Sequence, residues 1–144
     1  MARGRFAVAV HALVILATTP ETITSAFLAG SVNTDASCLR RMMIMLARAG
    51  LVDATEGREG GYRLARPPDE ITLADIYHAV SAEPVLRPNP AAANPRCPIS
   101  VAMVPAFAEI AADAESRFQE ALVRRTLADL ASHLELAARY SSPA

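Results

Sequence analysis

The 144-residue sequence predicts a mainly α-helical fold with one small β-hairpin. Three observations carry this prediction. Apolar residues recur at helical spacing in several segments, a glycine-rich stretch at 56–61 separates two β-like runs, and a proline-rich stretch at 84–98 precedes a long helical pattern. The length allows one small domain with a helical arm, but not two full-sized domains.

Two helices are expected before residue 32. The first spans 6–17, where one buried helix face is formed by Phe6, Val10, Leu13, Val14 and Ala17. Pro20 cannot continue this helix, so it ends before that residue. A short second helix is expected from about Thr24 to Ser31.

A third helix is expected at roughly 35–49. Asn33 or Thr34 can accept hydrogen bonds from the free amides at its start, and Gly50 closes its end. Its inward face carries Leu39, Met42, Met43 and Leu46. The nearby group of Met42, Met43 and Met45 is interpreted as core filling, with a sensor as the alternative.

A hairpin and a fourth helix follow. Residues 51–55 and 62–65 read as two short strands, and the glycines of 56–61 provide the positive backbone angles that a tight connection needs. Pro67 and Pro68 end the second strand. Thr72 begins a capping-box variant, so a fourth helix is expected from there to about Ser81.

The C-terminal half predicts a linker and two helices. Residues 84–98 contain five prolines and should be extended. A long helix begins at Pro98, with a coiled-coil-like seam at 107, 111, 114, 118 and 121. A second seam at 123, 127, 130, 134 and 137 has a shifted phase. It indicates a break near Arg124-Arg125, after which Thr126 caps a last helix running to about Arg139. The expected organisation is therefore a domain of four helices and a hairpin at 1–83, a linker at 84–98 and a helical dimerisation region at 99–144.

Charge is divided unevenly along the chain. The net charge is −1, but residues 1–66 carry eight Arg and five acidic residues, whereas 67–144 carry six Arg and ten acidic residues. With 52% hydrophobic residues, the chain is expected to fold as a soluble, cytoplasmic protein. Its longest apolar run, about a dozen residues, is too short to span a bilayer, and no clean signal-peptide cleavage site follows it.

The order helix, helix, helix, hairpin within about 65 residues predicts a winged helix-turn-helix, whose third helix fits the major groove of DNA. The domain at 1–83 is therefore expected to bind DNA. The residues expected to bind DNA are Thr34, Ser37, Arg40 and Arg41 on or before the third helix, Arg58 at the hairpin tip, Arg63 on its second strand, and Arg3 and Arg5 before the first helix. Arg66 is a further phosphate candidate. The alternative is that these arginines are only solvated surface charges.

Several segments resemble the Rrf2 family of transcription regulators. The strongest match is the wing and following helix at 57–76, GREGGYRLARPPDEITLADI, and the stretches RFAVAVHAL at 5–13 and LARAGLV at 46–52 agree with the same family. The C-terminal half resembles the family in layout only. The resemblance implies a homodimer that binds a partly palindromic operator, usually as a repressor.

The cysteines depart from one branch of that family. Many members hold an iron–sulfur cluster through three closely spaced linker cysteines, whereas this linker contains only Cys97. No cofactor is therefore expected, and the stretch NPRCPI at 94–99 resembles a cluster-free, YwnA-like branch. Cys97 is expected to be the N-cap of the long helix and lies beside Arg96. The positive end of the helix and the charge of Arg96 both favour the thiolate, so Cys97 is a redox-sensing candidate; the alternative is an unreactive packed thiol.

The remaining candidate side chains have simpler interpretations. Cys38 is interpreted as a small residue of the third helix, with a second redox thiol as the alternative. His11 is expected to be buried or half-buried, and His78 and His133 lack metal-ligand spacing, so no metal site is expected.

Two classes of function remain open from the sequence. The first is a sequence-specific DNA-binding regulator, and the second is a winged-helix module that binds proteins and has lost DNA binding. An enzyme is not expected, because the sequence has no nucleophile–base motif, no metal set and no phosphate-cradling loop.

Overall fold

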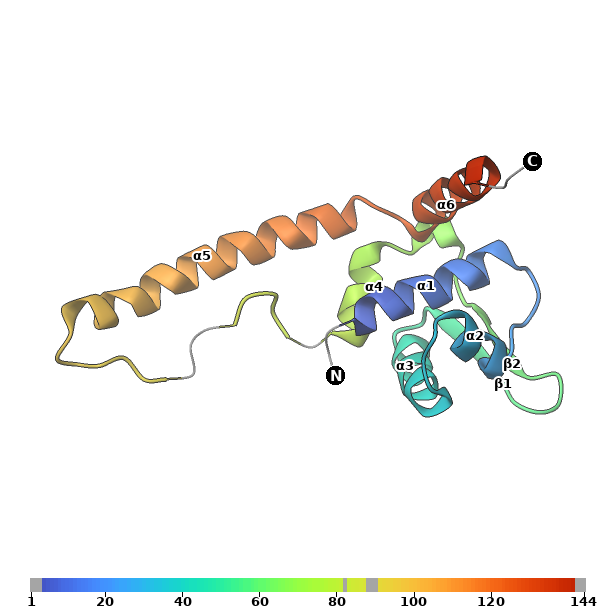
Figure 1. Ribbon diagram of the computed structural model, residues 1–144, viewed down its shortest axis with the longest axis horizontal. Helices are drawn as coiled ribbons and strands as arrows, with labels where there is room; N and C mark the ends of the chain where they lie inside the picture. Colours follow the sequence, from blue (N-terminus) through green and yellow to red (C-terminus); the bar gives the residue numbers. More distant parts are fainter. Residues whose placement is uncertain (1–3, 82, 88–90, 142–144) are drawn as a thin grey trace.

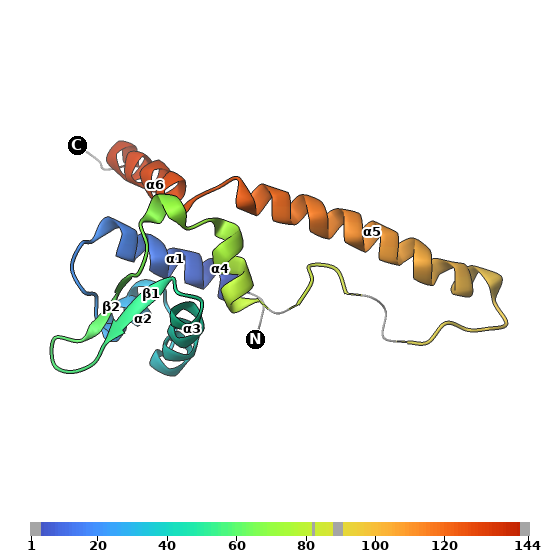
Figure 2. The same cartoon turned by 180° about the vertical axis from the view of Figure 1, so that it is seen from behind.

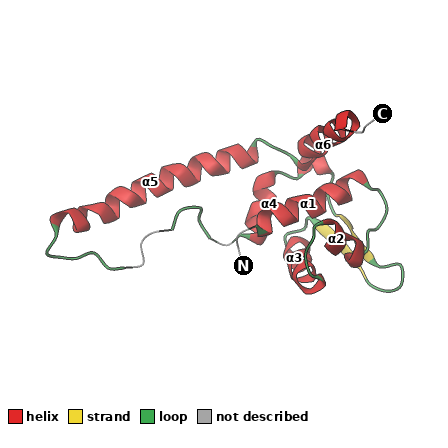
Figure 3. Ribbon diagram, viewed as in Figure 1, coloured by secondary structure: helices red, strands yellow, loops and turns green. Residues whose placement is uncertain are grey.

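The computed structural model describes residues 4–81, 83–87 and 91–141, with the backbone alone described after residue 135. Helices and strands follow one another in the order α1 (Arg5–Thr18), α2 (Ser25–Ser31), α3 (Ala36–Arg48), β1 (Val52–Thr55), β2 (Gly61–Leu64), a 3₁₀ turn (Pro68–Glu70), α4 (Leu73–Val80), α5 (Pro98–Val123) and α6 (Leu127–Ser141). We call α1–α4, the hairpin and α6 the head, and α5 the arm, which extends away from the head in both views (Figures 1 and 2). The mainly α fold with one hairpin confirms the predicted class (Figure 3).

Helix α1 lies at the centre of the head. Leu13 and Val14 are buried as predicted, but Ala9, Ala12 and Leu16 are buried as well, whereas Phe6, Val10 and Ala17 are only half-buried. The predicted single face is too narrow because α1 packs against α2 and α3 on one side and against α4 and α6 on the other. The head therefore has one continuous core around this helix.

The N-cap of α3 differs from the prediction. Asp35 caps the helix, with its Oδ1 accepting a hydrogen bond from the backbone N–H of Cys38 at 2.8 Å. Asn33 instead adopts a left-handed backbone with φ of 54°, and the N–H of Thr34 donates to the carbonyl of Ala29. The helix therefore begins one or two residues later than the sequence pattern suggested, and the prediction of Asn33 or Thr34 as the cap is wrong.

The hairpin is a two-stranded antiparallel sheet in which Val52 pairs with Leu64 and Thr55 with Gly61. A further bridge joins its second strand to the segment before α2, because Ile23 and Tyr62 exchange backbone hydrogen bonds of 2.9 and 2.8 Å. This bridge fixes the root of the hairpin against the helical part of the head.

Gly61→Ala is expected to destabilise the head by about 1–3 kcal/mol, because a methyl group there would overlap the carbonyl oxygen of Ile23 at a backbone φ of 156°. Thermal unfolding followed by circular dichroism measures the loss. The matched control is Gly30→Ala, since nothing lies within 4 Å of a methyl group at that position. Equal melting temperatures for Gly61→Ala and the wild type would show that the bridge is not tight.

The C-terminal helix α6 belongs to the head. Leu127 is fully buried in the core and Ala131 nearly so. Two backbone hydrogen bonds join the start of α6 to the start of α4: the N–H of Leu127 donates to the carbonyl of Ile71 at 2.8 Å, and the N–H of Leu73 donates to the carbonyl of Arg125 at 2.9 Å. The sequence grouped this helix with α5 in a dimerisation region, whereas the structure places the beginning of its apolar seam against α1.

Reciprocal side-chain caps begin both helices at this junction. Thr72 and Asp75 form the capping box of α4, and Thr126 and Asp129 exchange the same two hydrogen bonds at the start of α6. The predicted caps at Thr72 and Thr126, and the break at 124–125, are confirmed. The bonds from Thr126 to the carboxylate hold the pKa of Asp129 below its ordinary value.

Candidate nucleic-acid interface

Helix α3 presents two contrasting faces. Leu39, Met42, Met43 and Leu46 are buried, as predicted. Ser37, Arg40 and Arg41 are exposed on the other side. None of the salt bridges between described residues involves Arg40 or Arg41. Two guanidinium groups are thus held on a rigid helix with most of their donors directed to solvent.

The first turn of α3 orders these side chains. Arg40 Nε donates to the carbonyl of Ala36 at 3.1 Å, and Arg41 Nη2 lies 3.9 Å from the Sγ of Cys38. The Cys38 N–H bond lowers the pKa of Asp35, with smaller contributions from Ser37 and from the charge of Arg41. Asp35 therefore stays ionised at lower pH than an ordinary Asp side chain and continues to cap α3 there.

The hairpin brings two more of the predicted residues to the surface. Arg58 lies at the exposed tip, and no salt bridge between described residues includes it. Arg63 faces Asp53 across the two strands, with Nε 3.7 Å from Oδ2, and both side chains are largely exposed. A pair so exposed contributes little stability, so Arg63 can exchange its partner at small cost.

Other predicted contacts are placed less favourably. Arg5 donates to the carbonyl of Val80 at 3.3 Å, where it caps the C-terminal end of α4. Arg66 donates to the carbonyl of Glu70, and Thr34 is half-buried before the cap of α3. Arg3 lies outside the described residues. The roles of all these residues in DNA binding stay predictions.

The arm exposes a large apolar surface that the predicted seam did not include. Ile99 is 74% exposed, Val104 and Ile110 are each 59% exposed, and Val101 and Met103 are about half exposed. The seam residues Phe107, Ala111, Ala114 and Phe118 are instead half-buried against the rest of the chain. The sequence carried a signal that could have located this surface, because Glu109 is the only charged residue between 98 and 112.

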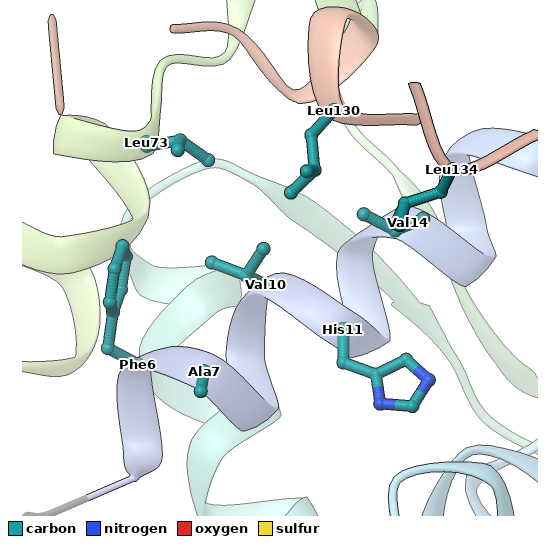
Figure 4. A pocket seen from close by; sticks show the side chains of 8 residues that line it. All are labelled: Phe6, Ala7, Val10, His11, Val14, Leu73, Leu130 and Leu134. Carbon is teal, nitrogen blue, oxygen red and sulfur yellow. The ribbon is translucent and has the colours of Figure 1, made fainter. Parts of the chain in front are cut away.

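A second apolar surface is a groove of about 470 Å³ on the head, between α1, α4 and α6. Val10 and Val14 point toward Leu73 and Leu130 across it, while His11 points away from them (Figure 4). His11 is exposed, so the expectation that it is buried or half-buried is wrong. The groove is therefore lined almost entirely by aliphatic and aromatic carbon.

The two cysteines lie on different parts of the molecule. Cys97 is half-buried as the N-cap of α5, as predicted, and its Sγ accepts from the N–H of Ser100 at 3.5 Å. Cys38 is exposed in the first turn of α3. The start of α5 and helix α3 are far apart in both views (Figures 1 and 2).

Three helices with a solvent-facing third helix, followed by a two-stranded wing, define a winged helix-turn-helix protein of the DNA-binding class. A family model described as "Iron-dependent Transcriptional regulator" matches residues 3–133. The chain belongs to that family, Rrf2, and is a DNA-binding transcription regulator rather than an enzyme.

Known proteins agree with this assignment along most of the chain. The HTH-type transcriptional regulator YwnA of Bacillus subtilis is 31% identical over 93% of this chain and 99% of its own length. A crystal structure of a DNA-binding protein has 28% identity and a TM-score of 0.70, covering 88% of this chain and 97% of its own. A transcriptional regulator from Lactobacillus plantarum shares the fold with a TM-score of 0.80 at 23% identity, covering 94% of this chain and 91% of its own.

Within the described part of the chain, no helix is both long and apolar enough to cross a membrane.

Proposed function

We propose that the chain regulates transcription as a homodimer that binds a partly palindromic duplex, with α3 in the major groove and the hairpin as the wing. The exposed face of α3 carries this proposal, because Arg40 and Arg41 stand there outside every salt bridge between described residues. Arginine reads guanine in the major groove and neutralises phosphates. Arg58 on the wing can enter a minor groove.

The arm supports the dimer. A helix that is apolar around its whole circumference is normally buried, and the N-terminal half of α5 is largely exposed within one chain. A second copy of α5 covers this surface, and a helix of 26 residues extends about 39 Å, long enough to connect two heads. A closed two-fold pair is the commonest solution for such a self-complementary face.

The groove on the head supports an antiparallel direction for this pair. The C-terminal end of α5 lies beside α4, and the apolar half is at its other end. An antiparallel pair brings the apolar end of each arm toward the head of the other protomer, where the groove of Val10, Val14, Leu73 and Leu130 is open. One arrangement therefore covers both apolar surfaces, whereas a parallel pair leaves the grooves exposed.

Selection from a pool of random duplexes tests the function. We expect the purified protein to enrich a motif with two related half-sites about one helical turn apart. Its affinity should fall with rising salt, and the slope of log affinity against log salt concentration should be about −0.9 for each phosphate that the protein neutralises. Sedimentation should show a dimer. A protein that enriches no duplex but captures a protein partner would instead be a winged-helix interaction module.

We infer that signalling does not use a cysteine-held iron–sulfur cluster. Such clusters are held by several thiolates, and the only two cysteines of this chain, Cys38 and Cys97, lie on distant elements. Among the residues the structure describes, no three metal-binding side chains are gathered in one place. This donor set does not fit the cluster of other family members.

Oxidation of Cys97 is the response we propose in its place. Peroxide oxidises a reactive thiolate to a sulfenic acid: Sγ gains a hydroxyl group and the rest of the peroxide leaves as hydroxide. The added oxygen would disturb the Sγ cap and the start of the arm. Mild peroxide is expected to reduce DNA affinity in the wild type and in Cys38→Ser, but not in Cys97→Ser, whose hydroxyl keeps the cap. Mass spectrometry locates the oxidised residue. If Cys97→Ser still loses DNA binding on oxidation, Cys97 is not the sensor.

A further inference from the structure

A three-ring stack joins the arm to the head. The ring of Tyr77 on α4 meets Phe6 of α1 edge-on, with centroids 5.4 Å apart, and meets Phe118 of α5 in the same manner at 5.0 Å. Such edge-to-face pairs have a preferred geometry. Helix α4 is the part of the head against which the arm packs. The angle between arm and head is therefore determined largely at this stack.

Hydrogen bonds surround the stack and connect three segments. Glu115 of α5 uses both carboxylate oxygens: Oε2 accepts from the N–H of Val85 in the linker, and Oε1 accepts from Nε2 of Gln119, each at 2.9 Å. Tyr77 donates its hydroxyl to the carbonyl of Glu83 at 3.0 Å. The beginning of the linker is thus attached to both α4 and α5.

The chain of hydrogen bonds continues to the head. Gln119 Oε1 lies 2.7 Å from Nε2 of His78 on α4. A carboxylate only accepts, so the amide nitrogen of Gln119 must point to Glu115 and its oxygen to His78. His78 consequently donates from Nε2, and every member of the chain Val85–Glu115–Gln119–His78 has a fixed donor or acceptor role.

The charge of Glu115 suits this role. The hydrogen bond from Gln119 and, to a smaller extent, that from the N–H of Val85 hold the pKa of Glu115 below its ordinary value. Burial opposes them with a smaller effect, and the nearby His78 makes the smallest contribution, which also lowers this pKa. Burial and the Glu115 charge together raise the pKa of Tyr77. At neutral pH Glu115 is therefore ionised while Tyr77 keeps the proton that it donates to Glu83.

We propose that Glu115 and Gln119 are positioning residues for DNA binding, which lock the arm to α4 and so set the separation and relative rotation of the two recognition helices. The inference rests on the proposed dimer, in which each α3 is carried by a head whose orientation is fixed through its own arm. Neither side chain touches DNA. The two residues make binding selective for one half-site spacing.

The test compares duplexes of different spacing. The selected duplex is made in its optimal form and with one base pair inserted between the half-sites, which moves one half-site by about 3.4 Å and rotates it around the axis. We expect the wild type to lose about tenfold or more in affinity on insertion. Glu115→Ala should bind the optimal duplex more weakly and lose most of this discrimination, with unchanged affinity for a duplex that holds a single half-site.

A double exchange provides the matched control. In Glu115→Gln/Gln119→Glu, the new amide at 115 can donate to the new carboxylate at 119 and accept from the N–H of Val85. The second oxygen of that carboxylate remains to accept from His78, so the spacing preference should return. The inference is overturned, while the proposed function stands, if Glu115→Ala keeps the wild-type spacing dependence. It is likewise overturned if the double exchange fails to restore that dependence although both variants melt at the wild-type temperature. A wild type that selects no duplex overturns the proposed function and the inference together.

Discussion

Replacing both Arg40 and Arg41 with Ala is expected to lower affinity for the selected duplex by on the order of 100-fold or more. Each arginine that reads a base contributes about 1–3 kcal/mol, and the proposed dimer would lose every contact twice. Both side chains are exposed and outside the core, so stability should change little. Mobility-shift titrations at several salt concentrations measure the effect, and the salt dependence should become shallower for each phosphate contact removed.

Arg124→Ala is the matched control, since it removes one exposed arginine at the end of α5, away from α3. Its affinity should stay close to that of the wild type. Arg58→Ala should give an intermediate loss that is larger for duplexes with a narrow minor groove. If Arg40 and Arg41 can be removed with no more effect than Arg124, α3 is not the recognition helix.

Ile110→Glu is expected to convert the protein to a monomer. The side chain is exposed in the single chain and buried in the proposed dimer, where an unpaired carboxylate costs several kcal/mol. The head should remain folded, because Ile110 lies outside its core. Sedimentation measures the mass, and DNA affinity should fall to that of one half-site.

Ser116→Glu is the control for this variant, because it adds the same charge at an exposed position of the same helix, beside Asp113 and Glu120. It should remain a dimer. Leu134→Glu, in the groove of the head, tests the antiparallel arrangement and should weaken the dimer without abolishing it. A dimeric Ile110→Glu would show that the arms do not pair through this surface.

The elements of this fold could be predicted because their signals are local. The apolar face of α3, the capping box of Thr72 and the break after Arg124 all depend on residues within about four positions of one another. The cap of α3 shows the limit of such reasoning. Asn33, Thr34 and Asp35 are all residue types that can cap a helix. The choice of Asp35 depends on the left-handed backbone of Asn33, which the sequence pattern does not reveal.

The junction between arm and head lay beyond prediction for a physical reason. Glu115 meets Val85 from 30 residues away, and Gln119 meets His78 from 41 residues away. Neither spacing has a periodic pattern, and each residue alone looks like a solvated polar side chain. By contrast, the exposed arginines of α3 and the wing follow from a motif, which is why the sequence could name candidate DNA contacts but not the polar residues at this junction.

The return of α6 to the core has a consequence for how the protein is made. The arm is an insertion between two parts of one folding unit, since Leu127 and Ala131 complete a core whose other buried residues lie between Ala9 and Val80. A ribosome must therefore synthesise the arm before the head can close, so a nascent or truncated chain that ends before α6 leaves Ile71 without its partner. Such a fragment should be a substrate for proteases rather than a free DNA-binding domain. Every folded head in the cell would then carry the arm through which the proposed dimer forms.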